Sequence, residues 1–154
     1  MTVWSGDWAW SMPLIVVSVI YHVICFAFIN DKVAQATRTV KNSRHFIFVF
    51  ALVMGVTTLL ATILHASEAA VWAVVYWLLR ALPDYKSAML YSLNAMTTYG
   101  HESAALEGHW RLMGALEALN GVILFGLTTA FLYAMIQAVW SGADSTSRDS
   151  TCAH

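Results

Sequence analysis

Three long stretches without charged side chains constrain this sequence more than any other feature. Residues Trp10 to Ile29 and Phe46 to His65 contain no Asp, Glu, Lys or Arg, and residues Leu112 to Val139 contain only Glu117. A helix needs about 20 predominantly apolar residues to cross a bilayer. Only 11% of the 154 residues are charged, whereas a soluble domain carries about 25%. The sequence therefore predicts an all-α membrane protein with three crossings.

The connection between the first two stretches sets the expected orientation. Residues Asp31 to His45 carry four basic side chains and one acidic side chain. Cytoplasmic connections are enriched in Lys and Arg, so the N-terminus is expected outside and the C-terminus in the cytoplasm. We expect a multi-pass protein of the cell's inner (plasma) membrane. Residues 1–45 form an N-terminal transmembrane helix and a basic cytoplasmic loop, and residues 141–154, rich in Ser, Thr and Asp, form a disordered tail.

The second apolar stretch is longer than one crossing requires. Continued as one helix from Phe46 to Leu82, it would be about 55 Å long, against a hydrocarbon core of about 30 Å. Two interpretations compete. The helix continues beyond the membrane, or it bends near Ser67, where His65, Ser67 and Glu68 interrupt the apolar run. We favour the bend, because the aromatic residues that follow suit the outer interface.

Ionisable side chains within the apolar stretches need partners. His65, Glu68 and Trp72 share one face of a helix, because three and four residues separate them. We interpret the His–Glu pair as a structural hydrogen bond, since two ligands alone do not define a metal site. We likewise interpret His22, in the first stretch, as a structural histidine bonded to a neighbour.

A short helix is predicted between the second and third crossings. Pro83 and Asp84 form a helix-start signal, with Asp84 as the N-cap. A helix from Tyr85 to Met96 would be about 18 Å long, which is too short to cross. We expect it to enter from outside and stop midway, with its carbonyl end favouring a cation. The backbone from Thr97 to Gly100 then returns outward, and such backbone at membrane depth must be buried in protein or line a water-filled path.

This order of elements resembles the pore module of the potassium-channel superfamily: an outer helix, a re-entrant pore helix with a filter loop, and an inner helix. The resemblance covers about residues 60–137. Its main motifs are Ala88 to Ser92 in the pore helix, Met96-Thr97-Thr98 at the start of the filter, and Gly121 to Ala130 in the inner helix, with Gly121 at the usual hinge position. A subgroup of small bacterial two-helix-pore proteins is also similar at His65, Glu68, Trp72, Ala81 to Asp84, Trp110 to Leu112, and Leu116 to Ala118.

The centre of the filter departs from the family pattern. The pattern T-T-V-G-Y-G-D reads here as Thr97-Thr98-Tyr99-Gly100-His101, so the simplest alignment deletes the V-G pair and replaces the last Asp with His. Filter carbonyls form rings that replace the hydration shell of potassium. Losing two residues shortens the filter by about 6–7 Å. We therefore expect weak or altered potassium selectivity.

The resemblance implies an ion channel, with residues 46–140 as the pore domain and a homotetramer as the assembly, because one re-entrant loop cannot enclose a pore. It implies roles for several residues. The filter is lined by Thr97, Thr98, Tyr99 and Gly100; the outer mouth holds His101 and Glu102; Glu117 supports the filter by bonding to the pore helix; and Asn120, Gly121 and Phe125 lie at the cavity or gate. For Asn120 and Phe125 we favour a packing role over one in permeation.

Two other functions stay open. A ring of His101 and Glu102 side chains would select divalent or hydrated cations, since carboxylate rings are a common device of cation pores. Alternatively, the shortened filter marks a non-conducting interaction or sensor subunit. We expect no enzyme, because no catalytic constellation is visible, and no cofactor beyond permeant cations (K⁺, and Na⁺ or divalent ions). The expected partners are further copies of the chain and membrane lipid, and the sequence has no basic cluster for nucleic acid.

Overall fold

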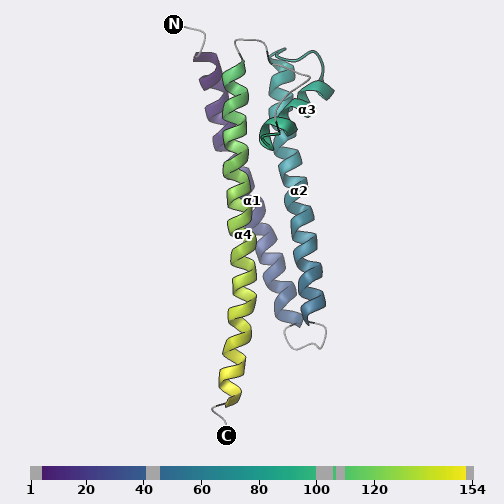
Figure 1. Cartoon of the computed structure of the whole chain (residues 1–154), viewed down its shortest axis with the longest axis vertical. Helices are drawn as coiled ribbons and strands as arrows, with labels where there is room; N and C mark the ends of the chain where they lie inside the picture. The colour runs from purple at the N-terminus through teal and green to yellow at the C-terminus, as the bar shows by residue number, and fades with distance from the viewer. Residues whose placement is uncertain (1–4, 41–45, 100–105, 107–109, 152–154) are drawn as a thin grey trace.

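The computed structural model describes the backbone of residues 5–40, 46–99, 106 and 110–151. These residues form four helices and no strand: α1 (Ser5–Val40), α2 (Phe46–Leu78), α3 (Tyr85–Met96) and α4 (Arg111–Thr151). The three long helices run along the long axis of the molecule, and α3 lies near the end where α2 finishes and α4 begins (Figure 1). Residues 6–35, 47–78 and 111–138 are long and apolar enough to cross a membrane. The predicted all-helical class is confirmed for the described residues, and three of the helices have the length and composition that a membrane crossing requires.

α1 is longer than the predicted first crossing. The sequence predicted a basic loop from Asp31, whereas α1 continues to Val40, so Lys32 and Arg38 lie in the helix. Residues 41–45 lie outside the described part of the chain. No Gly or Pro occurs between Asn30 and Val40, and extending an existing helix costs far less than starting one. The basic loop predicted over residues 31–45 is therefore wrong for residues 31–40.

α2 is one continuous helix from Phe46 to Leu78, so the predicted bend near Ser67 is wrong. The Ser67 hydroxyl donates to the carbonyl of Leu64 at 2.7 Å and lies 3.2 Å from the hydroxyl of Tyr21 in α1. The polar residues that seemed to interrupt the helix find their partners on neighbouring helices instead. A polar side chain with such a partner does not have to break the helix that carries it.

α4 also exceeds its predicted bounds. The sequence predicted a pore domain that ends at residue 140 and a disordered tail from Ser141, whereas the helix continues to Thr151. The described backbone is thus helical over residues 141–151, where the sequence predicted a disordered tail. Ser, Thr and Asp are poor helix formers only by a few tenths of a kcal/mol each, and the preceding helix has already met the cost of nucleation.

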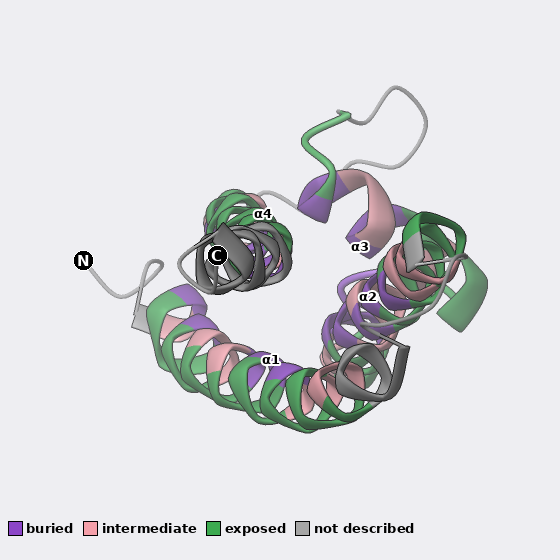
Figure 2. Ribbon diagram, turned by 90° about the horizontal axis from the view of Figure 1, so that it is seen from below, coloured by how far each residue is buried: buried purple, intermediate pink, exposed green. Residues whose placement is uncertain are grey.

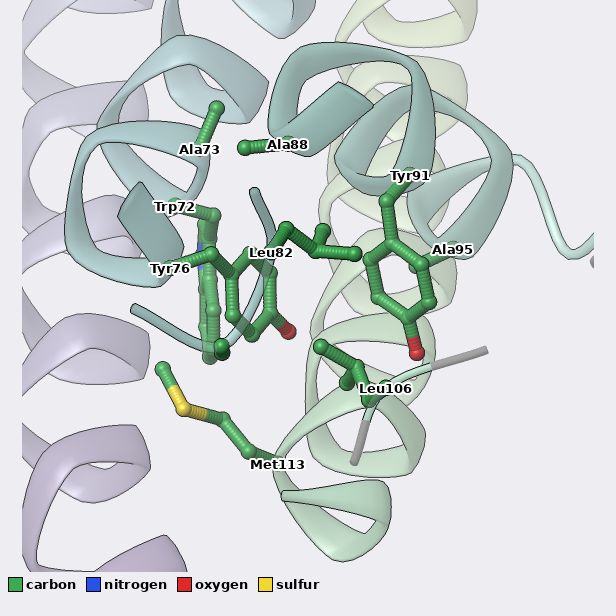
Figure 3. Packing of buried hydrophobic residues seen from close by; sticks show 10 residues of the cluster. Trp72, Ala73, Tyr76, Leu82, Ala88, Tyr91, Ala95, Leu106 and Met113 are labelled. Atoms are coloured by element: carbon green, nitrogen blue, oxygen red, sulfur yellow. The ribbon is translucent and has the colours of Figure 1, made fainter. Parts of the chain in front are cut away.

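α3 lies between α2 and α4, on the side of the bundle away from α1, when the molecule is viewed along its long axis (Figure 2). A buried core surrounds α3 at this end of the bundle. It consists of Trp72, Ala73, Tyr76, Ala81, Leu82, Ala88, Tyr91, Ala95, Leu106 and Met113 (Figure 3). These side chains come from α2, the turn after it, α3, α4 and the segment between α3 and α4. The largest cluster of buried apolar residues in the described part of the chain thus packs the short helix against its two long neighbours.

Candidate functional site

The start of α3 is set by Asp84, as the sequence predicted. Its Oδ1 accepts a hydrogen bond from the backbone N–H of Ser87 at 2.9 Å, and its Oδ2 accepts one from the Ser87 hydroxyl at 2.8 Å. The first of these bonds is the main cause that lowers the pKa of the exposed Asp84 carboxyl below its ordinary value. A side chain that accepts from an unpaired N–H in the first turn stabilises a helix start. The predicted N-cap and the predicted bounds, Tyr85–Met96, are both confirmed.

The end of α3 lies against α4 at Gly121. A Cβ atom added to Gly121 would lie 2.8 Å from the Cα atom and 2.9 Å from the carbonyl carbon of Met96, the last residue of α3. Gly121 follows Arg111, the first residue of α4, by ten residues, which corresponds to about 15 Å of helix. The apolar segment 111–138 of α4 has 28 residues, or about 42 Å of helix. α3 therefore stops about a third of the way along that segment.

Glu117 joins α4 to both α2 and α3. Its buried carboxylate accepts hydrogen bonds from the hydroxyl of Ser92 in α3 and, at 2.7 Å, from the hydroxyl of Tyr76 in α2. The Ser92 hydroxyl also lies 2.8 Å from the carbonyl oxygen of Ala69. The expected bond between Glu117 and the short helix is present. The sequence did not indicate Tyr76 as a second partner, because tyrosines at helix ends usually mark the interface.

The predicted filter residues follow directly from the end of α3. Thr97 is the C-cap, and its hydroxyl donates to the Leu93 carbonyl at 2.8 Å. Thr98 has φ 55°, a left-handed conformation that is unusual for a β-branched residue. The N–H of Tyr99 donates to the Asn94 carbonyl at 3.0 Å, and the Tyr99 side chain is 85% exposed. The chain thus turns sharply away from the helix at Thr98. The other predicted filter and mouth residues, Gly100, His101 and Glu102, lie outside the described residues.

The residues predicted at the cavity or gate occupy different environments. Asn120 is fully buried, and neither its amide oxygen nor its amide nitrogen has a hydrogen-bond partner among the described residues. Phe125 is 41% exposed and stacks on the ring of His65 in α2, with 4.3 Å between the ring centroids. Gly121 packs against the end of α3. Two of the three residues therefore lie inside the protomer, and Phe125 connects α4 to a polar cluster.

That polar cluster consists of His22, His65, Glu68 and Thr128, and we call it the three-helix cluster because it joins α1, α2 and α4. Nδ1 of His22 lies 2.8 Å from Glu68 Oε1, and Nδ1 of His65 lies 3.2 Å from Glu68 Oε2. The Thr128 hydroxyl oxygen lies 3.2 Å from Nε2 of His22 and 3.0 Å from Nε2 of His65. Both imidazole rings are therefore held between the carboxylate and the hydroxyl.

Sequence reasoning paired His65 with Glu68 but treated His22 as a separate structural residue. The signal that links them was present, since charged and ionisable groups inside apolar spans almost always pair with one another. His22, His65 and Glu68 are the ionisable residues of the first crossing and of the centre of the second. Which side of α1 faces α2 decides whether His22 meets Glu68. The spacing of residues within one helix does not reveal that orientation.

Comparison with protein-family models, with curated proteins and with solved structures finds no match to this chain. The described residues present two candidate sites. One is the half-length helix α3 with Thr97 and Thr98 at its end, braced by Glu117. The other is the three-helix cluster.

Proposed function

We propose that this chain is a cation channel that assembles from several copies around a shared axis. The observation that carries the proposal is the position of α3. It is a helix of 12 residues that lies between two helices long enough to span a membrane, and it stops about a third of the way along α4, at the contact of Met96 with Gly121. The polypeptide that follows it, Thr97 to Tyr99, departs from helical structure, and in the proposed arrangement it lies at membrane depth. Backbone of that kind is tolerated where it is buried in protein or lines a water-filled path.

The chemistry at the end of α3 suits a cation. The carboxyl end of a helix carries a partial negative charge of about half an elementary charge. Thr97 and Thr98, which are both exposed in the single chain, follow at that end. Their oxygens, with the carbonyls of Tyr99 and Gly100, would form rings when several copies meet, and rings of carbonyls replace the water around a permeating cation. Glu117 would keep α3 at a constant depth and so hold these rings in place.

The proposed assembly is a homotetramer, as the resemblance to the potassium-channel superfamily implies. One chain contributes one α3 and one filter loop, so a single copy has only one side of a pore. α4 carries large exposed apolar side chains on either side of Gly121 in the sequence, namely Leu119, Val122 and Ile123. Exposed apolar surface of this kind is covered either by lipid or by a neighbouring copy of the chain. In the proposed orientation the N-terminus lies outside the cell and the C-terminus lies in the cytoplasm. The proposed location of the channel is the plasma membrane.

The proposed selectivity is weak or altered for potassium. The filter sequence from Thr97 to Gly100 is two residues shorter than the family pattern. A shorter row of sites leaves a cation with more of its own water, which reduces discrimination by size. His101 and Glu102 would form the outer mouth and concentrate cations there.

Flux from liposomes tests the proposal. Purified protein would be reconstituted, its subunit number counted by cryo-electron microscopy, and flux measured separately for K⁺, Na⁺, Ca²⁺ and Mg²⁺. We expect flux of K⁺ and of Na⁺ within about tenfold of each other, which corresponds to about 1.4 kcal/mol. Flux of divalent ions alone would favour selection by the His101 and Glu102 ring. Absence of flux for every ion, from inserted and oligomeric protein, would leave an interaction or sensor subunit.

A further inference from the structure

The three-helix cluster lies apart from α3 and needs an explanation of its own. His22 and Glu68 are fully buried, and the side chain of His65 is 11% exposed. Thr128 follows Gly121 by seven residues, so the cluster lies about 10 Å along α4 beyond the end of the short helix. Ionisable groups at such depth are costly and usually functional. Donor atoms of His22, His65 and Glu68 all lie within 4.8 Å of one another.

Counting hydrogen-bond donors shows what the cluster lacks. The Thr128 hydroxyl has one proton, and it lies 3.0 Å from the carbonyl of Leu124, the acceptor to which it donates. Its oxygen can then only accept from the Nε2–H groups of His22 and His65. A neutral imidazole carries one proton, so a ring that donates from Nε2 to Thr128 has a lone pair at Nδ1. Nδ1 of His22 is within hydrogen-bond distance of Glu68 Oε1, at 2.8 Å, whereas Nδ1 of His65 and Oε2 of Glu68 are buried and have no hydrogen-bond partner among the described residues. A cation between the three side chains would satisfy all of these atoms.

We propose that His22, His65 and Glu68 form a binding site for a divalent transition-metal ion, of which Zn²⁺ fits best. Two imidazoles and one carboxylate are a common ligand set for zinc, with bonds of about 2.0–2.2 Å. Tetrahedral geometry at such bond lengths places neighbouring donor atoms about 3.3 Å apart. The Nδ1-to-carboxylate distances of 2.8 Å and 3.2 Å need only a small opening to reach that value. The fourth position is left for water.

The arrangement of the rings supports a shared ion. Two imidazoles on one tetrahedral zinc have their centroids about 5 Å apart, and those of His22 and His65 are 5.2 Å apart. Metal-bound histidines usually form a hydrogen bond to an outer partner, which fixes the tautomer and the ring orientation. Thr128 is that partner here. Mg²⁺ and Ca²⁺ do not fit, because both prefer six or more oxygen ligands. A bound ion would tie α1 to α2, next to the contact of Tyr21 with Ser67.

Metal binding to the full-length protein in detergent tests the site directly. After removal of metals with a chelator, we expect one Co²⁺ per chain, with the intense visible absorption of a tetrahedral site, and displacement of Co²⁺ by Zn²⁺. Glu68→Gln and His22→Gln should each lower the affinity at least 100-fold. Thr128→Val, which keeps all three ligands, should lower it about 10- to 100-fold. Mg²⁺ and Ca²⁺ should not compete.

Two variants serve as matched controls. Tyr21→Phe removes a contact between α1 and α2 beside His22 and leaves the three ligands unchanged. Cys25→Ser removes a thiol, a chemical group with affinity for metals. Both should bind Co²⁺ as the unaltered protein does. The histidines elsewhere in the chain remain in every variant, so a loss of binding is assigned to the site. Zn²⁺ should also raise the melting temperature of the unaltered protein, a readout that needs no variant.

The proposal fails if the unaltered protein binds no stoichiometric metal, or if Glu68→Gln binds Co²⁺ with unchanged affinity. The shared cation would then be a proton, and the cluster a hydrogen-bonded brace between helices. Neither result depends on ion flux, so the metal site and the proposed channel stand or fall separately.

Discussion

Replacing Gly121 with alanine tests whether the depth of α3 is set by its contact with α4. The added methyl group would lie 2.8 Å from the Cα atom of Met96, whereas carbon atoms in contact prefer about 3.5–4.0 Å. The obstructing atoms belong to the backbone, so no side chain can rotate away. The end of α3 must move by about 1 Å to restore an ordinary contact. Overpacking of this kind typically costs about 1–3 kcal/mol.

Gly126→Ala is the matched control for Gly121→Ala. Gly126 lies in the same helix, and a Cβ atom there would have no neighbour within 4 Å. Both substitutions gain the same intrinsic helix preference of about 1 kcal/mol, so the difference in stability between the two variants isolates the clash. The assays are reversible unfolding in mixed detergent and K⁺ flux from liposomes. We expect Gly121→Ala to be less stable than Gly126→Ala by about 1–3 kcal/mol and to conduct less, because Thr97 moves with Met96. Equal stability of the two variants would refute the inferred contact.

Three further predictions concern single carboxylates. Glu117→Ala should destabilise the protein by about 1–3 kcal/mol, since it leaves the buried hydroxyl of Tyr76 without its acceptor, whereas the Ser92 hydroxyl keeps the Ala69 carbonyl. Glu117→Gln should lose less than half of that in the same unfolding assay, and equal losses would contradict the brace. The pKa of Asp84 is lower in the folded protein than its ordinary value of 3.8. The stabilisation by this N-cap is therefore fully present above pH 3.8, and it is lost as the pH falls through the lowered pKa. The melting temperature of Asp84→Asn should therefore fall less between pH 7 and pH 3 than that of the unaltered protein, and parallel curves would show that the carboxylate contributes nothing. Glu102→Gln should reduce cation conductance at low salt and have little effect at high salt, where surface charge is screened; unchanged conductance at low salt would show that this side chain points away from the path.

The local signals in the sequence were sufficient for α3 but misleading for the long helices. Asp84 predicted the start of α3, because an N-cap acts on the N–H groups of its own first turn. The residues after it predicted where α3 ends. The polar residues around Ser67 predicted a bend that does not occur. Their partners, Tyr21 in α1 among them, come from another helix, and a satisfied polar group does not interrupt the helix that carries it. The ends of α1 and α4 were also placed too early, since composition says little about how far an established helix extends.

The all-helical class, the three helices long and apolar enough to cross a membrane, and the short helix between the last two are determined by the sequence itself. A bilayer forces the backbone to satisfy its own hydrogen bonds, so uncharged stretches of sufficient length must become helices whatever surrounds them. Only the tertiary structure decided which side chains meet. His22 meets Glu68, Tyr76 meets Glu117, and Gly121 meets Met96. These contacts depend on the rotation and depth of whole helices relative to one another, and the packing of buried side chains at each crossing sets both quantities.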